Sequence, residues 1–200
     1  GCGADANPEP RGEMKAAHQN GRAVADEVER LLAGQRLPVD VALSARMERI
    51  QLPFGDLPSR EELAQRAKTE GRVGDYARSL LAELDRTGSL PKELDYSVGV
   101  WTFGDDLAMV FLAGEVVVDY ALRLKRELDG TRLWVTAYAN DVPCYIASKR
   151  LLPEGGYEVD SSMISYGRPT RFAPEAEDRI VDTVQKLIPV EFKSPRTSGD

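Results

Sequence analysis

Residues 107–138 read LAMVFLAGEVVVDYALRLKRELDGTRLWVTAY, and this stretch decides the fold class. Its two ends, 107–113 and 132–138, are apolar runs of strand length. Residues 116–128 between them carry an apolar stripe at helical spacing. The stripe consists of Val117, Ala121, Leu124 and Leu128. A strand, a helix and a second strand in succession predict a right-handed crossover between two parallel strands.

The residues before this stretch predict a hairpin. Residues 94–103 (LDYSVGVWTF) have the composition of a strand, and Gly104-Asp105-Asp106 after them is a turn sequence. With 107–113 they form two apolar runs joined by a tight turn. We therefore expect an antiparallel hairpin that is buried on both faces.

A further strand is expected over residues 39–50 (VDVALSARMERI), where side chains alternate in character. One side carries Leu43, Ala45 and Met47, and the other carries Arg46 and Glu48. Such alternation is typical of a strand with one solvent-facing side. Together the patterns predict an α/β fold: a mixed sheet with flanking helices.

Helices are expected in three other segments. Residues 14–32 place apolar side chains at steps of three and four. Residues 59–87 read as two helices, and Ser59 with Glu62 three residues later is a capping box at their start. Residues 174–188 form a last amphipathic helix with proline at its first turn.

Composition bounds the class of protein. The chain has 200 residues, of which 42% are hydrophobic and 30% charged, a balance typical of globular proteins. Its 26 Lys and Arg against 33 Asp and Glu give a net charge of −7, which argues against a nucleic-acid partner because phosphate binding needs clustered cations. We expect one domain over 1–192 and a disordered tail over the polar, breaker-rich residues 193–200.

Metal chemistry made by this chain alone is limited by its composition. Cys2 and Cys144 are the two cysteines and His18 is the single histidine. These are too few for a cysteine-rich or histidine-rich zinc site. His18 falls in the first turns of a predicted helix and is interpreted as an ordinary surface or half-buried residue.

Two places carry polar side chains next to buried strands. Glu115 stands between an apolar strand and an apolar helix, where it is either at the mouth of a site or a charge that favours the helix dipole. The loop 138–145 (YANDVPCY) follows a buried strand and includes Asn140. Polar groups at the carboxyl end of a strand are a common site location, but a turn closed by Asn and Asp side chains is an equal alternative.

Four stretches together resemble the neutral/alkaline (non-lysosomal) ceramidase family, in the later part of its catalytic domain. The stretches are GADANPEPRG, similar to the family's Gly-Asp-Val-Ser-Pro-Asn loop; FLAGEVVVDYALRLKREL, with Gly-Glu before a helix that carries Arg123-Leu124; YANDVPCYIAS; and GGYEVDSSMISYGRP. The resemblance is strongest over 94–170 and present over 1–34. It implies that this chain is an incomplete part of a larger α/β catalytic domain whose sheet is completed by upstream strands.

The resemblance implies an activity and a metal. The family hydrolyses the amide of ceramide, using one zinc ion. Glu115 and Tyr145 match the family's carboxylate and tyrosine zinc ligands, and the two histidine ligands are expected upstream of this chain. Asn140, Tyr157 and Glu158 are expected next to the site.

The loop near the start of the chain departs from the family pattern. Asp5 matches the family's aspartate, but Asn7 stands at the position of its serine. An amide is no hydroxyl nucleophile, although its NH2 group can polarise a carbonyl or hold a water. A zinc-activated water can attack an amide without a serine, so hydrolysis survives this change.

Three functional hypotheses follow. The first is a fragment of a zinc-dependent amidohydrolase acting on an N-acyl lipid or another amide, inactive as the isolated 200 residues. The second is a non-catalytic ceramidase-like domain used for binding or structure. The third and weakest is a cysteine hydrolase using Cys144, which needs a basic partner. The resemblance allows a secreted, periplasmic or cell-surface protein, and leaves membrane contact and oligomeric state open.

Overall fold

The crossover predicted over 107–138 forms the centre of the protein. In the computed structural model, which describes residues 1–36, 39 and 41–194, β3 (Leu107–Leu112) and β5 (Leu133–Thr136) pair in parallel. Helix α4 (Val118–Glu127) joins them. The prediction of parallel strands is confirmed.

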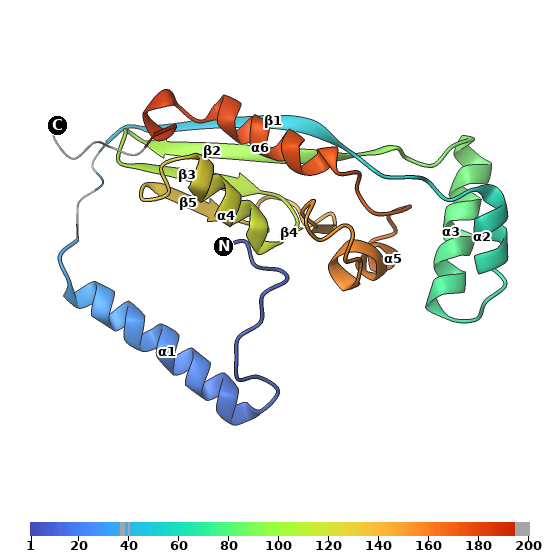
Figure 1. Ribbon diagram of the computed structural model, residues 1–200, viewed down its shortest axis with the longest axis horizontal. Helices are drawn as coiled ribbons and strands as arrows, with labels where there is room; N and C mark the ends of the chain where they lie inside the picture. Colours follow the sequence, from blue (N-terminus) through green and yellow to red (C-terminus); the bar gives the residue numbers. More distant parts are fainter. Residues whose placement is uncertain (37–38, 40, 195–200) are drawn as a thin grey trace.

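A mixed sheet surrounds this unit. Its strands lie in the order β1-β2-β3-β5 (Figure 1). β1 (Leu43–Pro53) and β2 (Glu93–Phe103) are antiparallel over their full length, and β2 and β3 form the predicted antiparallel hairpin. The expected fold class, a mixed α/β sheet with flanking helices, is confirmed.

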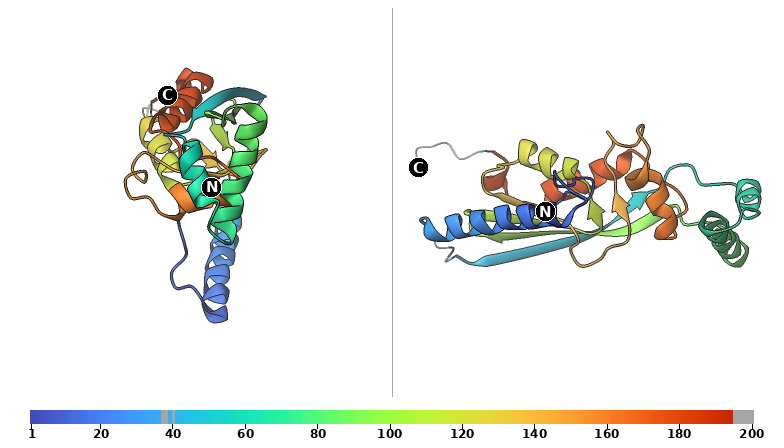
Figure 2. Two further views of the ribbon diagram at one scale, coloured as in Figure 1. Left: turned by 90° about the vertical axis from the view of Figure 1, so that its right-hand side faces the viewer. Right: turned by 90° about the horizontal axis from the view of Figure 1, so that it is seen from below.

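The core lies on one face of the sheet. Helix α6 (Glu175–Leu187) packs over β1 and β2, and α4 packs over β5 (Figure 2). Val98, Val110, Leu124 and Ile180 are fully buried between these layers. Burying side chains of this size stabilises the fold by about 1.5–3 kcal/mol each.

The opposite face of the sheet is open among the described residues, which corrects the expectation of a hairpin buried on both faces. Trp101 of β2 is 42% exposed and Trp134 of β5 is 58% exposed. Strand side chains alternate between the two faces, and α4 and α6 cover the same one. Half of the apolar side chains of the hairpin and of β5 therefore lack a covering layer.

The exposed and the covered side of β1 are also the reverse of those that its alternation suggests. Leu43 and Met47 lie on the open face and are more than half exposed. Glu48 lies on the α6 side, where its carboxylate pairs with Lys186 at 2.8 Å. Alternation predicted that the two sets separate, but the position of α6 decides which set is covered.

Helix α1 (Met14–Ala33) forms as predicted and stands apart from the sheet (Figure 1). Its apolar stripe faces outward, with Met14 75% and Val24 66% exposed. Of the helices in the described ranges, none has the length and hydropathy needed to span a bilayer.

The helical pair predicted over 59–87 projects from one end of the sheet (Figure 1). It consists of α2 (Arg60–Arg66) and α3 (Arg72–Thr87). The capping box is present: the Glu62 N–H donates to Ser59 Oγ at 3.1 Å, and the Ser59 N–H donates to Glu62 Oε2 at 2.7 Å. The pair has a small core of its own, consisting of Leu63, Ala77, Leu80 and Leu90.

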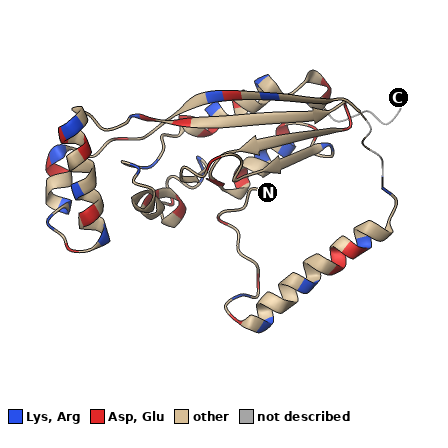
Figure 3. Cartoon of the chain, turned by 180° about the vertical axis from the view of Figure 1, so that it is seen from behind, with Lys and Arg blue, Asp and Glu red and all other residues tan. Residues whose placement is uncertain are grey.

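The remaining elements are short. They are β4 (Glu115–Val116), β6 (Tyr145–Ile146), a π-helical turn η1 (Tyr157–Ser161), α5 (Ser162–Ser165) and a 3-10 turn η2 (Val190–Phe192). Of the tail expected to be disordered, residues 195–200 lie outside the described residues, and the single domain over 1–192 stays a prediction. Basic and acidic residues are both spread over the helices and strands of the chain (Figure 3).

Candidate functional site

The site is built on a kink that follows β3. Gly114 has a φ of +81°, and a Cβ there would lie 2.7 Å from the Cys144 carbonyl oxygen. Glycine lets the chain pass at this distance and continue as β4, which pairs in parallel with β6. Glu115 and Tyr145 are register partners in this pair, and the Glu115 N–H donates to the Cys144 carbonyl at 3.0 Å.

The Glu115 carboxylate is surrounded by phenols. Tyr138 donates to Glu115 Oε2 at 3.0 Å and Tyr166 donates to Oε1. Tyr145 is hydrogen-bonded to the same carboxylate. The Tyr157 ring packs edge-on against Tyr145 with centroids 5.3 Å apart. We call these four side chains the tyrosine cluster.

Three phenols of the cluster, those of Tyr138, Tyr145 and Tyr166, have raised pKa values. The hydrogen bond to Glu115, together with burial, raises the pKa of Tyr166 to about 12. Burial and then the Glu115 hydrogen bond raise the pKa of Tyr145 and of Tyr138 above the ordinary value. At neutral pH the carboxylate therefore accepts from neutral phenols, which hold it in one orientation.

Backbone strain marks the segment that brings Tyr138 to the carboxylate. Tyr138 has a φ of 57° and Asn140 a φ of 67°, both in the left-handed region. This conformation costs a residue such as Tyr138 about 1–2 kcal/mol, whereas asparagine adopts it more readily. Two hydrogen bonds hold it: Tyr138 N–H to the Gly114 carbonyl at 3.0 Å, and Gly114 N–H to the Asp141 carbonyl at 2.8 Å. Strained residues held in this way concentrate at functional sites.

The N-terminal loop bears on the two alternatives for Glu115, a place at the mouth of a site or a charge at the start of the helix. Asp5 Oδ1 accepts the Val118 N–H at 2.8 Å and so caps α4, while Glu115 is bonded to phenols. The same loop is tied to β4, because Gly3 N–H donates to the Val116 carbonyl at 3.0 Å. Asp5 thus has a capping role, and Asn7 two residues later is exposed.

The other residues expected beside the site lie at different distances from the carboxylate. Tyr157 belongs to the tyrosine cluster and is 53% exposed. Glu158 is half-buried, and its main-chain carbonyl accepts from Ser162 Oγ at 3.4 Å. Asn140 is exposed and lines a separate cavity of about 410 Å³ with Arg49 and Asp95.

Tyr138 and Tyr166 were not among the residues expected from sequence, although both contact Glu115. The signal was available, because four of the seven tyrosines in the chain follow residue 137, in the two stretches YANDVPCY and GGYEVDSSMISYGRP. Their convergence on one carboxylate depends on the turn at Tyr138 and on the path of η1 and α5.

The cysteine hypothesis loses its support. Cys144 is fully buried, and burial raises the pKa of its thiol to about 12. The nucleophilic thiolate is therefore scarce at neutral pH. The nearby Arg168 guanidinium donates to the Pro143 carbonyl at 2.9 and 3.1 Å. His18 lies on α1 and is exposed.

The donor atoms at Glu115 supply only part of what a zinc site needs. Within residues 1–36, 39 and 41–194, no three His, Cys, Asp or Glu side chains lie close enough together to hold an ion. Glu115 and Tyr145 offer one carboxylate and one phenol, whereas a catalytic zinc ion takes three protein ligands and a water. The described residues therefore fit two positions of such a site and do not close it.

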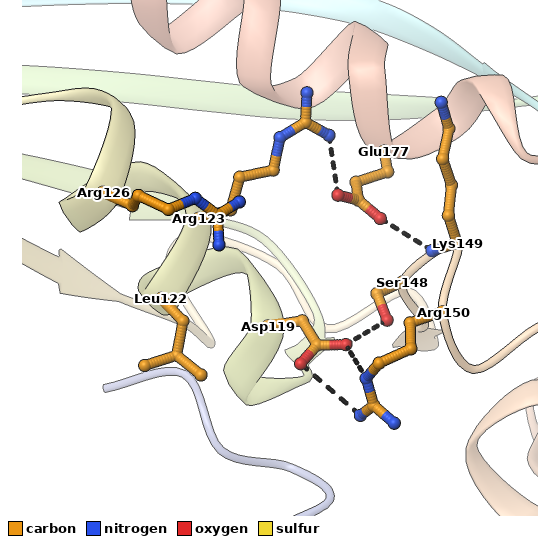
Figure 4. Close-up of a pocket in the computed structure, with 8 residues that line it drawn as sticks. All are labelled: Asp119, Leu122, Arg123, Arg126, Ser148, Lys149, Arg150 and Glu177. Atoms are coloured by element: carbon orange, nitrogen blue, oxygen red, sulfur yellow. Dashed lines mark hydrogen bonds and ion pairs between the residues drawn. The ribbon is translucent and has the colours of Figure 1, made fainter.

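A second concave region lies beside α4 and is lined by charged side chains (Figure 4). Arg123 pairs with Glu177 at 2.6 Å, and Arg150 pairs with Asp119 at 2.9 Å. Ser148 Oγ also donates to Asp119. Three of the four cations that line this cavity of about 300 Å³, Arg123, Lys149 and Arg150, pair with carboxylates, and these ion pairs link α4 to α6 and to the segment 148–150.

Of the comparisons with known proteins, the one with solved structures gave a match. No family model matches the chain, and no curated protein matches it. Among solved structures, it is similar to the crystal structure of neutral ceramidase from Pseudomonas aeruginosa, at 15% sequence identity and a TM-score of 0.47. The match covers 98% of this chain and 36% of that one, so the chain spans about a third of that protein's length.

Proposed function

We propose that this chain is part of an amide hydrolase acting on an N-acyl lipid of the ceramide type. In this proposal Glu115 and Tyr145 are two ligands of a zinc ion, and two histidines outside these residues supply the others. The observation that carries it is the pairing of Glu115 with Tyr145 across β4 and β6, with the phenols of Tyr138 and Tyr166 donating to the same carboxylate.

The position of the two oxygens supports this proposal. Glu115 follows β3 and Tyr138 follows β5, so both lie at the carboxyl ends of parallel strands. Ligands of open α/β sheets bind at such ends. The hydrogen bonds from Tyr138 and Tyr166 hold the carboxylate, as outer hydrogen bonds commonly orient metal ligands.

The chain's own residues have separate roles in this proposal. A zinc ion at Glu115 supplies a Lewis acid for water activation and carbonyl polarisation. Tyr138 and Tyr166 orient the carboxylate. Tyr157, half-exposed at the rim of the tyrosine cluster, provides an aromatic surface for substrate. The phenols of Tyr138 and Tyr166 act as hydrogen-bond donors to the Glu115 carboxylate.

A second candidate is a non-catalytic domain of the same fold, used for binding or structure. One observation favours it. Asn7 is an exposed amide at the position where the resembling family has a serine. This candidate predicts that the protein from its native source holds no zinc.

The test uses the protein as its native source makes it. Intact mass gives the length of the polypeptide, and elemental analysis gives zinc per chain. Hydrolysis of a short-chain ceramide is then followed for the unaltered protein and for Glu115→Gln, Tyr145→Phe and the control Glu61→Gln, which changes an exposed carboxylate on α2. We expect one zinc per chain, lost in the two site variants and kept in the control.

Three results would oppose the proposal. A zinc-free protein without amidase activity favours the binding candidate. Zinc retained at full stoichiometry in both Glu115→Gln and Tyr145→Phe means that the metal lies elsewhere. Activity in the 200 residues alone would contradict the expectation that the site needs further ligands.

A further inference from the structure

Two separate segments supply phenols to the tyrosine cluster. Tyr145 ends the segment 138–145 that follows β5, and Tyr166 belongs to the segment 157–168 that forms η1 and α5. Their ring centroids are 6.4 Å apart, and both phenols are hydrogen-bonded to the Glu115 carboxylate. Within the described residues, no main-chain hydrogen bond runs between the two segments. Their relative position therefore depends on side-chain contacts.

Arg168 provides a direct link between these segments. Its Nε and Nη2 atoms donate to the Pro143 carbonyl oxygen at 3.1 and 2.9 Å. The same guanidinium is hydrogen-bonded to the Cys144 thiol. A guanidinium presents its N–H groups in a fixed planar fork, so two of them on one carbonyl oxygen fix its direction as well as its distance.

The backbone that Arg168 holds leads directly to the carboxylate. The Cys144 carbonyl, one residue after that of Pro143, accepts the Glu115 N–H at 3.0 Å. Tyr145 comes next in the chain and is the register partner of Glu115. A shift of the backbone at this point would therefore move both oxygen ligands of the proposed site together.

The main chain of Arg168 is itself held from two sides. Its N–H donates to the Met163 carbonyl of α5 at 2.9 Å, and its carbonyl accepts from the Tyr76 hydroxyl of α3. Arg72 of α3 also donates to Ser165 Oγ. The helical pair α2–α3, which projects from the end of the sheet near α5 (Figure 1), thus fixes the point from which the Arg168 side chain extends.

We propose that Arg168 is a positioning residue of the candidate site, whose guanidinium holds the two segments together so that Tyr145 and Tyr166 reach the same carboxylate. It acts through the Pro143 carbonyl and not on substrate. Hydrogen bonds in this outer position commonly orient the groups that bind a metal. The inference rests on the proposed function for its effect on hydrolysis, whereas its effect on the geometry of the tyrosine cluster is independent of any metal.

The direct test measures the ionisation of Tyr166 in the full-length protein, with a chelator present so that no metal competes for Glu115. Arg168→Met keeps an unbranched stem and removes every donor. The carbon NMR signal of Tyr166 Cζ, assigned with Tyr166→Phe, reports the titration. The hydrogen bond to Glu115, together with burial, raises the pKa of Tyr166 to about 12. We expect Arg168→Met to move this pKa toward the ordinary 10.0, because Tyr166 loses its place at the carboxylate.

Arg179→Met is the matched control. Arg179 of α6 also donates to a main-chain carbonyl, that of Gln51 at 2.7 Å, but outside the tyrosine cluster. We expect this variant to be destabilised while the pKa of Tyr166 stays at about 12. Arg168→Lys should give an intermediate pKa, because an ammonium keeps the charge but not the planar fork.

Two results of the titration would overturn the proposal. In the first, the pKa of Tyr166 stays at about 12 in Arg168→Met. In the second, the pKa falls equally in Arg168→Met and Arg179→Met, which would indicate a general effect of lost stability.

A measurement at pH 7 covers the case in which Arg168→Met fails to fold. The coupling between Glu115 and Tyr166 is obtained from Glu115→Gln, Tyr166→Phe and the double variant by urea unfolding. The cycle is repeated in the Arg168→Lys and Arg179→Met backgrounds. We expect the coupling to be weakened by Arg168→Lys and kept in Arg179→Met, and equal coupling in both backgrounds overturns the proposal.

Activity separates this inference from the proposed function. Where the full-length protein hydrolyses a short-chain ceramide, Arg168→Met should lower kcat by about 10–100-fold with a smaller change in KM. Unchanged kcat in a variant whose Tyr166 pKa has fallen would overturn the effect on hydrolysis. A fall of that pKa in a zinc-free, inactive protein leaves the positioning role standing and opposes the proposed function, and an unchanged pKa in an active zinc protein does the reverse.

Discussion

Glu115→Gln tests the hydrogen bond that Tyr166 donates to the Glu115 carboxylate. The Glu115 carboxylate is the main reason that the pKa of Tyr166 is about 12 instead of its ordinary 10.0. Glutamine keeps the shape but removes the charge, so the pKa of Tyr166 falls toward its ordinary value. Because Tyr166 is only partly buried, solvent screening reduces the interaction to about 1 kcal/mol.

The sign of the pH dependence follows from the raised pKa. The protonated phenol is favoured in the folded state, so the stabilisation is complete below pH 10.0 and is lost as the pH rises toward about 12. We expect the unfolding free energy of the unaltered protein to fall across this alkaline window more steeply than that of Glu115→Gln. Urea unfolding at a series of pH values measures the difference.

A double-mutant cycle isolates the pair. Glu115→Gln, Tyr166→Phe and the double variant are unfolded at pH 7, and the coupling free energy is expected at about 1 kcal/mol. The tyrosinate absorbance of Glu115→Gln should also rise at lower pH than that of the unaltered protein. A coupling near zero together with unchanged titration of both proteins would refute the assignment of the Glu115–Tyr166 hydrogen bond.

Three other perturbations have defined outcomes. Gly114→Ala places a Cβ 2.7 Å from the Cys144 carbonyl oxygen and should lower the unfolding free energy by about 2–4 kcal/mol. Gly21→Ala, at a position in the middle of α1 with open space around it, should raise the unfolding free energy by about 0.5–1 kcal/mol. Equal denaturation midpoints of the two variants would contradict the kinked path of the chain at Gly114. Asp5→Ala should destabilise by about 1 kcal/mol through loss of the α4 cap, and an unchanged midpoint would show that the loop is not docked. Cys144 should react with a thiol reagent only after unfolding, because burial raises its pKa to about 12, and fast native-state alkylation would restore the cysteine hypothesis.

Features with local causes were predictable from the sequence. The crossover over 107–138 follows from strand-length apolar runs on either side of a helical stripe, and the structure has it. The capping box of Ser59 and Glu62 needs only residues three apart, and both of its hydrogen bonds are present. Such signals depend on neighbours in sequence, so no tertiary information is required.

The site could be predicted only in part. Resemblance to a family pointed to Glu115 and Tyr145, and the structure makes them register partners. Tyr138 and Tyr166 were missed, because their contacts depend on a left-handed turn at Tyr138 and on the path of the chain through η1 and α5. No spacing along the chain encodes that convergence.

The sequence by itself determined the hydrophobic periodicity of each segment. That periodicity indicates which segments are helices, which are strands, and which side chains of each share a face. The tertiary structure alone decided which face is covered. β1 shows the difference, since its alternation separates Met47 from Glu48, yet α6 covers the charged side and leaves Met47 exposed. The same holds for α1, whose stripe is plain in the sequence but uncovered in the structure. Periodicity is a property of the local backbone, whereas burial depends on which layers pack against it.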